Sequence, residues 1–270
     1  MQGKTLQLIE AARLELDQYH PMTLRQVFYR LVSGLVLENT EASYKRLSRV
    51  LVQARQEGMI PWEWLEDRLR EPRHVSMWDD LADFAEVAAR AYRRDVWATQ
   101  PDYLEVWLEK DALSGVFGLV LQPYGVTLNV GRGYDSWSSI HNAARRLDDS
   151  TTVLYFGDFD PSGEDMVRSL AERLGFFGCG PEMVKVALNL EDIERYGLPP
   201  MPAKKSDSRA AGFIAEFGDV AVELDALPPP VLRERLEAAV RDRMDLDALE
   251  DVKRLEAKER DLLRQRLGTE

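Results

Sequence analysis

Residues 151–163 constrain the fold of this chain more than any other stretch. They begin with the β-branched and aromatic run TTVLYF, which predicts a buried strand. The run ends at the turn-forming letters GDFDP, and apolar residues at helical spacing follow from Met166 to Leu174. A strand, a sharp polar turn and a helix form the repeating unit of a parallel α/β sheet. Ligands of such sheets bind at the carboxyl ends of the strands.

Two acids, Asp158 and Asp160, stand where this strand ends. Side chains alternate along an extended chain, so both carboxylates are expected to project to the same side. Two carboxylates held together repel each other unless a cation neutralises them. The pair therefore indicates a divalent metal site.

Three other interpretations of the same residues compete with the metal site. Asp, Pro, Ser and Gly all form turns, so the segment can be a plain turn. Asp158, Asp160 and Ser162 imitate the start of a calcium loop, but Ser169 stands at the twelfth position, where that loop needs an acid. The third is an aspartyl nucleophile of the phosphatase type. A second acidic element lies upstream, at Glu109, and it favours the metal site over these three interpretations.

Further βα units flank this segment. Apolar runs at 103–108, 125–130 and 183–188 predict strands, and the patterns at 136–147 and 163–174 predict helices between them. Such an alternation predicts a parallel α/β sheet flanked by helices. Residues 202–209 form a polar stretch. Further along the chain, Pro228-Pro229-Pro230 opens a long charged helix or helical pair, which either packs on the domain or contacts a partner.

The first hundred residues have a different pattern. Helices are expected over 3–18, from an N-cap at Thr23 to Gly34, and over 43–56, and the extended piece 59–62 follows. Helix, turn, helix and a short extended wing are typical of a winged helix-turn-helix, which binds DNA. A connector that is partly helical, at 78–94, leads to the sheet.

The charge of the chain is unevenly distributed. Its net charge is −12 and its pI is about 4.9, which argues against a general nucleic-acid coat. Residues 23–58 nevertheless hold six basic and three acidic side chains, a local net charge of +3. The basic residues expected to contact DNA phosphates there are Arg25, Arg30, Lys45, Arg46, Arg49 and Arg55.

Composition narrows the chemistry of the metal site. One cysteine, Cys179, and three scattered histidines leave oxygen atoms as the ligands, which favours Mg²⁺ or Mn²⁺. The turn Gly131-Arg132-Gly133 is too short for a dinucleotide fingerprint and no Walker-type motif occurs, so no nucleotide site is expected. Without a signal pattern or a membrane-length apolar run, we expect a cytoplasmic protein that does not enter a membrane.

Residues 102–190 resemble a Toprim domain, the metal-binding module of topoisomerases, primases and some nucleases. Three features carry the resemblance: Glu109-Lys110 after a strand, a glycine-rich turn after the next strand, and the run from Asp158 to Gly163. The resemblance implies that Glu109, Asp158 and Asp160 hold Mg²⁺, with Glu109 alternatively acting as a general acid or base. Lys110 and Arg132 then lie where they would contact DNA.

The order of the two parts resembles the A subunit of topoisomerase VI and the meiotic double-strand-break transesterase. This wider resemblance covers about residues 20–230 and starts from Arg25-x-x-Phe28-Tyr29. It implies that Tyr29 is the nucleophile and that the protein is a homodimer, in which the tyrosine and the metal site that act together come from different subunits. The other stretches that look family-like are Arg55 with its two preceding residues, Gly133-Tyr134, 190–193 and 222–227.

The residues themselves agree with this chemistry. Arg25 and Tyr29 are four apart and share one helix face, where a guanidinium can pair with a phosphate. A tyrosine with its ordinary pKa near 10 is a poor nucleophile, so it needs that help and a nearby metal. The alternative is that Phe28 and Tyr29 are aromatic core of the first helical part.

We therefore expect an α/β protein with three parts. A winged helix-turn-helix (CAP-like) domain with its connector covers 1–100, a Toprim domain 101–230 and a C-terminal helical segment 231–270. The expected function is metal-dependent cleavage of double-stranded DNA with a 5′-phosphotyrosyl link at Tyr29, and strand passage would need a separate ATPase subunit. The alternatives are a hydrolytic Toprim nuclease with a structural tyrosine, and a non-catalytic DNA-binding subunit.

Overall fold

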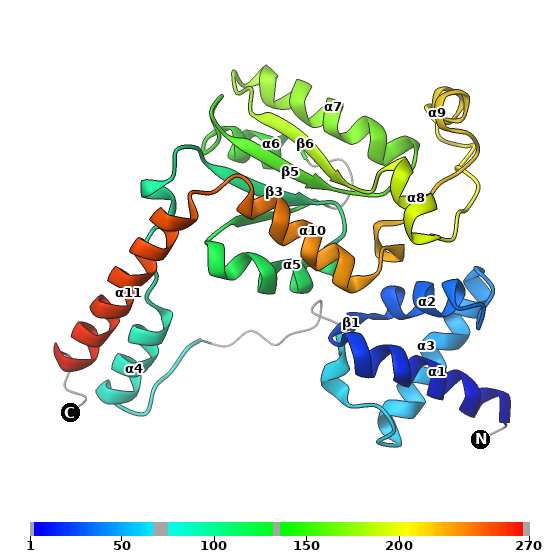
Figure 1. Cartoon of the computed structure of the whole chain (residues 1–270), viewed down its shortest axis with the longest axis horizontal. Coiled ribbons are helices and arrows are strands. Elements are labelled where there is room, and N and C mark those ends of the chain that lie inside the picture. The colour runs from blue at the N-terminus through cyan, green and yellow to red at the C-terminus, as the bar shows by residue number, and fades with distance from the viewer. Residues whose placement is uncertain (1–2, 67–74, 132–135, 267–270) are drawn as a thin grey trace.

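The computed structural model describes residues 3–66, 75–131 and 136–266, and its centre is a four-stranded sheet (Figure 1). All neighbouring strands are parallel, in the order β4-β3-β5-β6. The expected parallel α/β sheet is thus confirmed. Its strands are β3 (Leu104–Leu108), β4 (Thr127–Val130), β5 (Thr152–Phe156) and β6 (Glu182–Ala187).

The register of the sheet brings two chain segments to one edge. Leu108, the last residue of β3, lies opposite Phe156, the last residue of β5. The Glu109 backbone N–H then donates to the Phe156 carbonyl at 2.9 Å. Consequently the residues that follow both strands, Glu109 and Gly157, leave the sheet side by side at its carboxyl edge.

Helices cover both faces of the sheet (Figure 1). On one face lie α5 (Ser114–Leu121) and α10 (Pro229–Arg241), and on the other α6 (Trp137–Ala144) and α7 (Pro161–Phe176). Strand β5 is buried on both sides: Leu154 and Phe156 belong to the first core, and Val153 and Tyr155 to the second. This alternation is the period of two that an extended chain imposes.

The N-terminal part is helical, with α1 (Gly3–Tyr19), α2 (Leu24–Ser33) and α3 (Glu41–Gln56). The expected N-cap is confirmed, because the Thr23 hydroxyl accepts from the Gln26 N–H at 3.2 Å and the Gln26 side chain caps the Thr23 N–H in return. Gly34 ends α2 as expected. The third helix begins at Glu41 because Thr40 caps it.

The expected extended piece at 59–62 is neither helix nor strand over residues 59–61. The 3-10 turn η1 (Trp62–Trp64) follows it and leads to β2 (Leu65–Glu66). Strand β2 pairs with β1 (Met22–Thr23) in parallel, across the two helices between them. A wing is an antiparallel hairpin, and within the described ranges this two-residue parallel pair does not form one.

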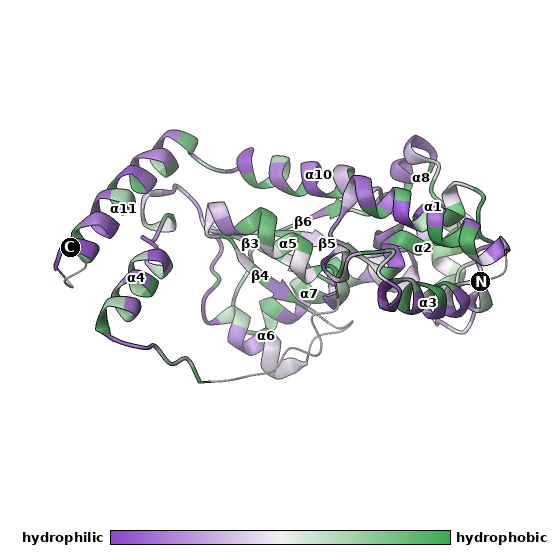
Figure 2. Cartoon of the chain, turned by 90° about the horizontal axis from the view of Figure 1, so that it is seen from below, coloured by the Kyte–Doolittle hydropathy of each residue, from purple (hydrophilic) through white to green (hydrophobic). Residues whose placement is uncertain are grey.

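The remaining elements connect and flank these layers. Helix α11 (Leu246–Arg266) packs beside α4 (Leu81–Ala91), away from the sheet, and Glu259 joins them by accepting from the Tyr92 hydroxyl at 2.6 Å (Figures 1 and 2). No helix in the described part of the chain has both the length and the apolar character to cross a membrane. The other connecting and flanking elements are η3 (Trp97–Thr99), η4 (Asp111–Leu113), η5 (Gln122–Tyr124), α8 (Leu190–Tyr196), α9 (Ala210–Phe217) and η6 (Leu224–Ala226).

Candidate active site

The three carboxylates that the sequence singles out lie together at the carboxyl edge of the sheet. Glu109 follows β3, and its Oε2 accepts from the Asp158 N–H at 3.1 Å and from the Tyr155 hydroxyl at 3.2 Å. Asp160 is the N-cap of α7, with its Oδ1 accepting from the Gly163 N–H at 2.7 Å. The ends of two neighbouring strands and the start of one helix therefore position the acids.

Two glycines allow this close approach. A Cβ on Gly157 would lie 2.5 Å from Oε2 of Glu109, and one on Gly163 would lie 2.1 Å from the Asp158 carbonyl oxygen. Real Cβ contacts stay beyond 3.0 Å, so a side chain at Gly157 would displace the Glu109 carboxylate, and one at Gly163 would meet backbone that cannot move aside. The glycine of the sequence motif is thus explained by the turn that carries the acids.

We expect Gly163→Ala to lower the free energy of unfolding by about 1–3 kcal/mol, since the added methyl group meets backbone that cannot rotate away. Gly175→Ala, near the other end of α7, is the matched control because its Cβ would meet nothing within 4 Å. The free energy of unfolding of Gly175→Ala should rise by about 0.5–1 kcal/mol, because alanine has a higher helix propensity than glycine. Urea unfolding of both variants checks this, and equal shifts of the same sign would contradict it.

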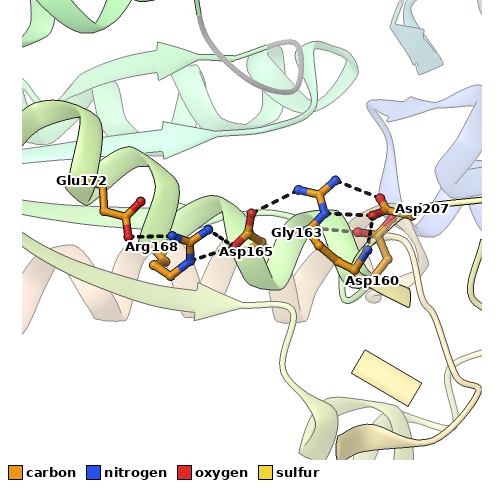
Figure 3. A network of polar contacts seen from close by, with 7 residues as sticks. Asp160, Gly163, Asp165, Arg168, Glu172 and Asp207 are labelled. Carbon is orange, nitrogen blue, oxygen red and sulfur yellow. Dashed lines mark hydrogen bonds and ion pairs between the residues drawn. The ribbon is translucent and has the colours of Figure 1, made fainter. Parts of the chain in front are cut away.

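A polar network fixes the first turns of α7 beside the acids (Figure 3). Asp165 accepts from Arg168 on its own helix and from Arg209 at 3.1 Å. Arg209 also donates to both oxygens of Asp207 at 2.8 Å, so the loop before α9 is tied to α7. This tie holds the loop next to Asp160.

Sequence reasoning missed two further acids of the site, Glu223 and Asp225. The segment that carries them reaches the site through an antiparallel bridge, in which Phe159 and Val222 exchange hydrogen bonds of 2.9 and 2.8 Å. The Leu224 N–H then donates to Oδ1 of Asp158 at 2.8 Å. Their signal in the sequence was the alternation of apolar and acidic residues over 222–225, to which no chemistry was assigned.

Lys110 lies at the centre of these acids. Its Nζ is 2.7 Å from Glu223 Oε2, 3.0 Å from Asp225 Oδ2 and 3.3 Å from Asp158 Oδ1. Burial acts to lower the pKa of Lys110, but the three carboxylates outweigh it and the pKa lies above its ordinary value. The lysine therefore serves as an internal counter-ion, and its expected contact with DNA stays a prediction.

Burial has the largest effect on the pKa of Asp158. It raises the pKa of Asp158 to about 7, a shift that Lys110 opposes and Glu109 increases. The pKa of the buried Tyr155 hydroxyl lies far above its ordinary value, through burial and through Glu109, Asp158 and Asp160. All three carboxylates thus act on one hydroxyl group.

The donor set fits a hard divalent cation in its chemistry. Glu109, Asp158 and Asp160 each accept hydrogen bonds from the described residues through one oxygen only, which leaves the second for a ligand. Oxygen-only sites suit Mg²⁺ and Mn²⁺. In this conformation no three acidic, His or Cys side chains of the described ranges converge as a metal-binding group.

Arg25 and Tyr29 approach the cluster from α2, which packs on η6. The Arg25 guanidinium forms an ion pair with Glu223, the same carboxylate that binds Lys110. Tyr29 is 4% exposed and stacks edge-on against Phe28. Burial and then Glu223 hold the pKa of Tyr29 well above its ordinary value. The two residues lie on the Lys110 side of the cluster, and no described hydrogen bond joins Tyr29 to Glu109, Asp158 or Asp160.

The other candidate DNA contacts are scattered over the helical part. Arg30 is turned inward to Glu15 at 2.8 Å, whereas Lys45, Arg46 and Arg49 lie exposed along α3. Arg55 donates to the Trp62 carbonyl at 2.7 Å. Arg132 and the turn Gly133-Tyr134 lie outside the described residues.

Comparisons of the sequence with models of known protein families and with curated proteins found no match. The site is therefore defined by its geometry. Carboxylates with an unused oxygen lie at one sheet edge, and a helix that carries an arginine and a tyrosine packs beside them. Such an arrangement can bind a divalent cation together with a phosphate ester.

Proposed function

We propose that this protein cleaves DNA with the help of a divalent metal ion, and that Tyr29 is the nucleophile. One observation carries the proposal: Lys110 and Glu223 link Asp158 at the sheet edge to Arg25, on the helix that also presents Tyr29. Glu109, Asp158 and Asp160 would hold Mg²⁺ or Mn²⁺. The bound ion would supply a Lewis acid that polarises the phosphodiester.

The chemical step is a transesterification. The Tyr29 oxygen attacks phosphorus, a Tyr–O–P bond forms at the 5′ end of the break, and the bond from phosphorus to the 3′ oxygen breaks. The tyrosine proton passes to solvent, or to Glu109 where that residue acts as general base instead of binding the ion, and the 3′ oxygen takes up a proton to become a hydroxyl group. Arg25 pairs with the phosphate and stabilises its charge.

We further propose that the helical part binds double-stranded DNA in the manner of a winged helix-turn-helix domain. This role is supported by the exposed basic side chains of α3, which are Lys45, Arg46 and Arg49. The proposed enzyme is a homodimer, in which the tyrosine of one subunit meets the metal site of the other. Because Tyr29 is buried in this structure and α2 packs on η6, that encounter requires α2 to leave η6. Strand passage would need a separate ATPase subunit.

The test uses supercoiled and end-labelled linear DNA with Mg²⁺ or Mn²⁺, quenched with detergent and analysed with and without protease. With the wild-type protein, the labelled DNA end should stay covalently bound to the protein after the detergent quench and be released only by the protease. Tyr29→Phe and Asp158→Asn should each lower cleavage at least about 100-fold. Tyr29→Phe should bind DNA as the wild type does, because the phenol oxygen contacts no phosphate before the attack.

A hydrolytic nuclease is the second candidate, and the burial of Tyr29 with its raised pKa favours it. In that reaction water attacks phosphorus and the tyrosine is structural. Protein-free ends that persist in Tyr29→Phe and vanish in Asp158→Asn would establish it. Salt-sensitive DNA binding without cleavage in any divalent metal would instead indicate a non-catalytic subunit.

A further inference from the structure

A cavity of about 60 Å³ lies between the candidate metal acids and the loop that follows α8. Asp158 and Asp160 line it from the turn after β5, and Met201, Pro202 and Lys204 line it from the loop. A water molecule needs roughly 10–15 Å³ of such space, so the cavity has room for an ion and a few oxygen atoms but not for a nucleoside. A ligand that enters it must therefore be as small as a phosphate group.

Two backbone bridges hold the start of this loop beside the acids. Met201 and Ala221 exchange hydrogen bonds of 2.8 and 2.7 Å. Val222, the next residue, is bridged to Phe159, which stands between the two acids in the chain. The position of the loop relative to the acids is thus set by backbone hydrogen bonds through one intervening segment.

The backbone around Lys204 is anchored on both sides. The Ala203 N–H donates to Oδ1 of Asp219 at 2.8 Å, and the Lys204 carbonyl accepts from the Asp207 N–H at 2.9 Å. Asp207 is itself tied to α7 through Arg209 (Figure 3). The Lys204 side chain is exposed, so an anchored backbone carries a flexible ammonium group at the cavity.

Lys204 differs in its contacts from two other lysines near the acids. Lys110 pairs with three carboxylates, and Lys185 pairs with Glu164 and donates to the Asp158 carbonyl at 3.3 Å. No ion pair or hydrogen bond joins the Lys204 ammonium group to the part of the chain that the structure describes. Lys204 can therefore bind an anion without first giving up a carboxylate.

The charges around the cavity favour an anion that binds together with a cation. Asp158 and Asp160 would repel a phosphate that arrived alone. Glu223 also lines the cavity, but two ion pairs already offset its charge. A divalent ion at the two aspartates would reverse the sign of the charge there, and the Lys204 ammonium group would add a second attraction for the phosphate.

We propose that Lys204 is a phosphate-binding residue of the candidate active site. Its ammonium group donates to one oxygen of a phosphate that also faces the ion held by Asp158 and Asp160. Phosphate binding then depends on the divalent ion as well as on the lysine. That the phosphate belongs to a DNA strand rests on the proposed function, and free phosphate is the other source of the same chemistry.

Calorimetry with inorganic phosphate, in buffer with Mg²⁺ or with a chelator, tests Lys204 without DNA. Lys204→Gln removes the charge and Lys204→Arg keeps it. The matched control is Lys205→Gln, since Lys205 is 78% exposed and lies outside the described lining. Wild type and Lys205→Gln should bind phosphate in Mg²⁺ and lose that binding in the chelator. Lys204→Gln should bind phosphate at least about fivefold more weakly in Mg²⁺, and Lys204→Arg should keep most of the affinity.

The affinity of a fluorescently labelled DNA duplex in Mg²⁺, measured in the Tyr29→Phe background, identifies the source of the phosphate. Weaker duplex binding with Lys204→Gln, but not with Lys205→Gln, would support a phosphate of the strand. Weaker phosphate binding with unchanged duplex affinity would overturn the strand as the source. Equal phosphate affinity of Lys204→Gln and wild type, or no phosphate binding by wild type in Mg²⁺, would overturn the role of Lys204. The proposed function fails separately, if phosphate binds as expected but DNA is not cleaved.

Discussion

The Lys110→Met variant should lose about 3 kcal/mol of its free energy of unfolding at neutral pH. Lys110 is 17% exposed and contacts Asp158, Glu223 and Asp225. Asp225 is 1% exposed, and its carboxylate accepts no well-aligned hydrogen bond from the described residues, so its charge depends on this ion pair. A methionine fills the same space but leaves the buried carboxylates without their counter-ion. Urea unfolding in the presence of a chelator measures the loss.

Two comparisons isolate this effect. Lys205→Met removes a lysine that is 78% exposed and 4.0 Å from Asp219, and it should change stability by less than about 0.5 kcal/mol. The double variant Lys110→Met/Asp225→Asn should recover part of the loss, because it removes the buried charge along with its partner. It also provides a measurement if the single variant does not fold. A loss below about 1 kcal/mol in Lys110→Met would contradict the assignment of Lys110 as the counter-ion.

The Asp158→Asn variant should be more stable than the wild type at pH 8 and yet inactive in DNA cleavage. Burial raises the pKa of Asp158 to about 7, whereas its ordinary value is 3.8. Between these values the folded protein keeps a proton that the unfolded chain has lost. The free energy of unfolding of the wild type should therefore fall as pH rises from about 4 to about 7, by at most about 1.4 kcal/mol per pH unit. Asparagine does not titrate and still accepts from the Leu224 N–H.

Thermal unfolding from pH 4 to pH 8 in a chelating buffer measures this difference. Asp242→Asn, at the exposed end of α10, should follow the wild-type profile. Addition of Mg²⁺ should stabilise the wild type at pH 8 and leave Asp158→Asn unchanged, because the ion binds the ionised carboxylate. An Asp158→Asn profile parallel to that of the wild type would contradict the raised pKa.

Much of the fold could be predicted from local sequence. The alternation of strands and helices predicted the parallel sheet, and Thr23 and Gly34 marked the two ends of α2 through their own backbone and side-chain chemistry. The acids at the sheet edge were predictable for a topological reason. In a parallel sheet, residues that follow neighbouring strands meet at one edge. Glu109 and Asp158 therefore meet across 49 residues of chain.

Contacts that depend on distant segments could not be predicted in this way. Arg25 and Glu223 pair across 198 residues, and Lys110 and Glu223 across 113. The parallel pairing of β2 with β1, across the two helices between them, was likewise not predicted. Propensity and periodicity describe which face of an element is apolar, but not which distant element covers it.

The sequence by itself thus determined the elements, the sheet and the acids at its edge, since each follows from residues close together in the chain. Only the tertiary structure decided the partners of those acids. The bridge between Phe159 and Val222 brings Glu223 and Asp225 to Lys110, and the packing of α2 on η6 brings Arg25 to the same cluster. Burial then fixes the charge state of Asp158, because the cost of removing a carboxylate from water depends on everything that surrounds it.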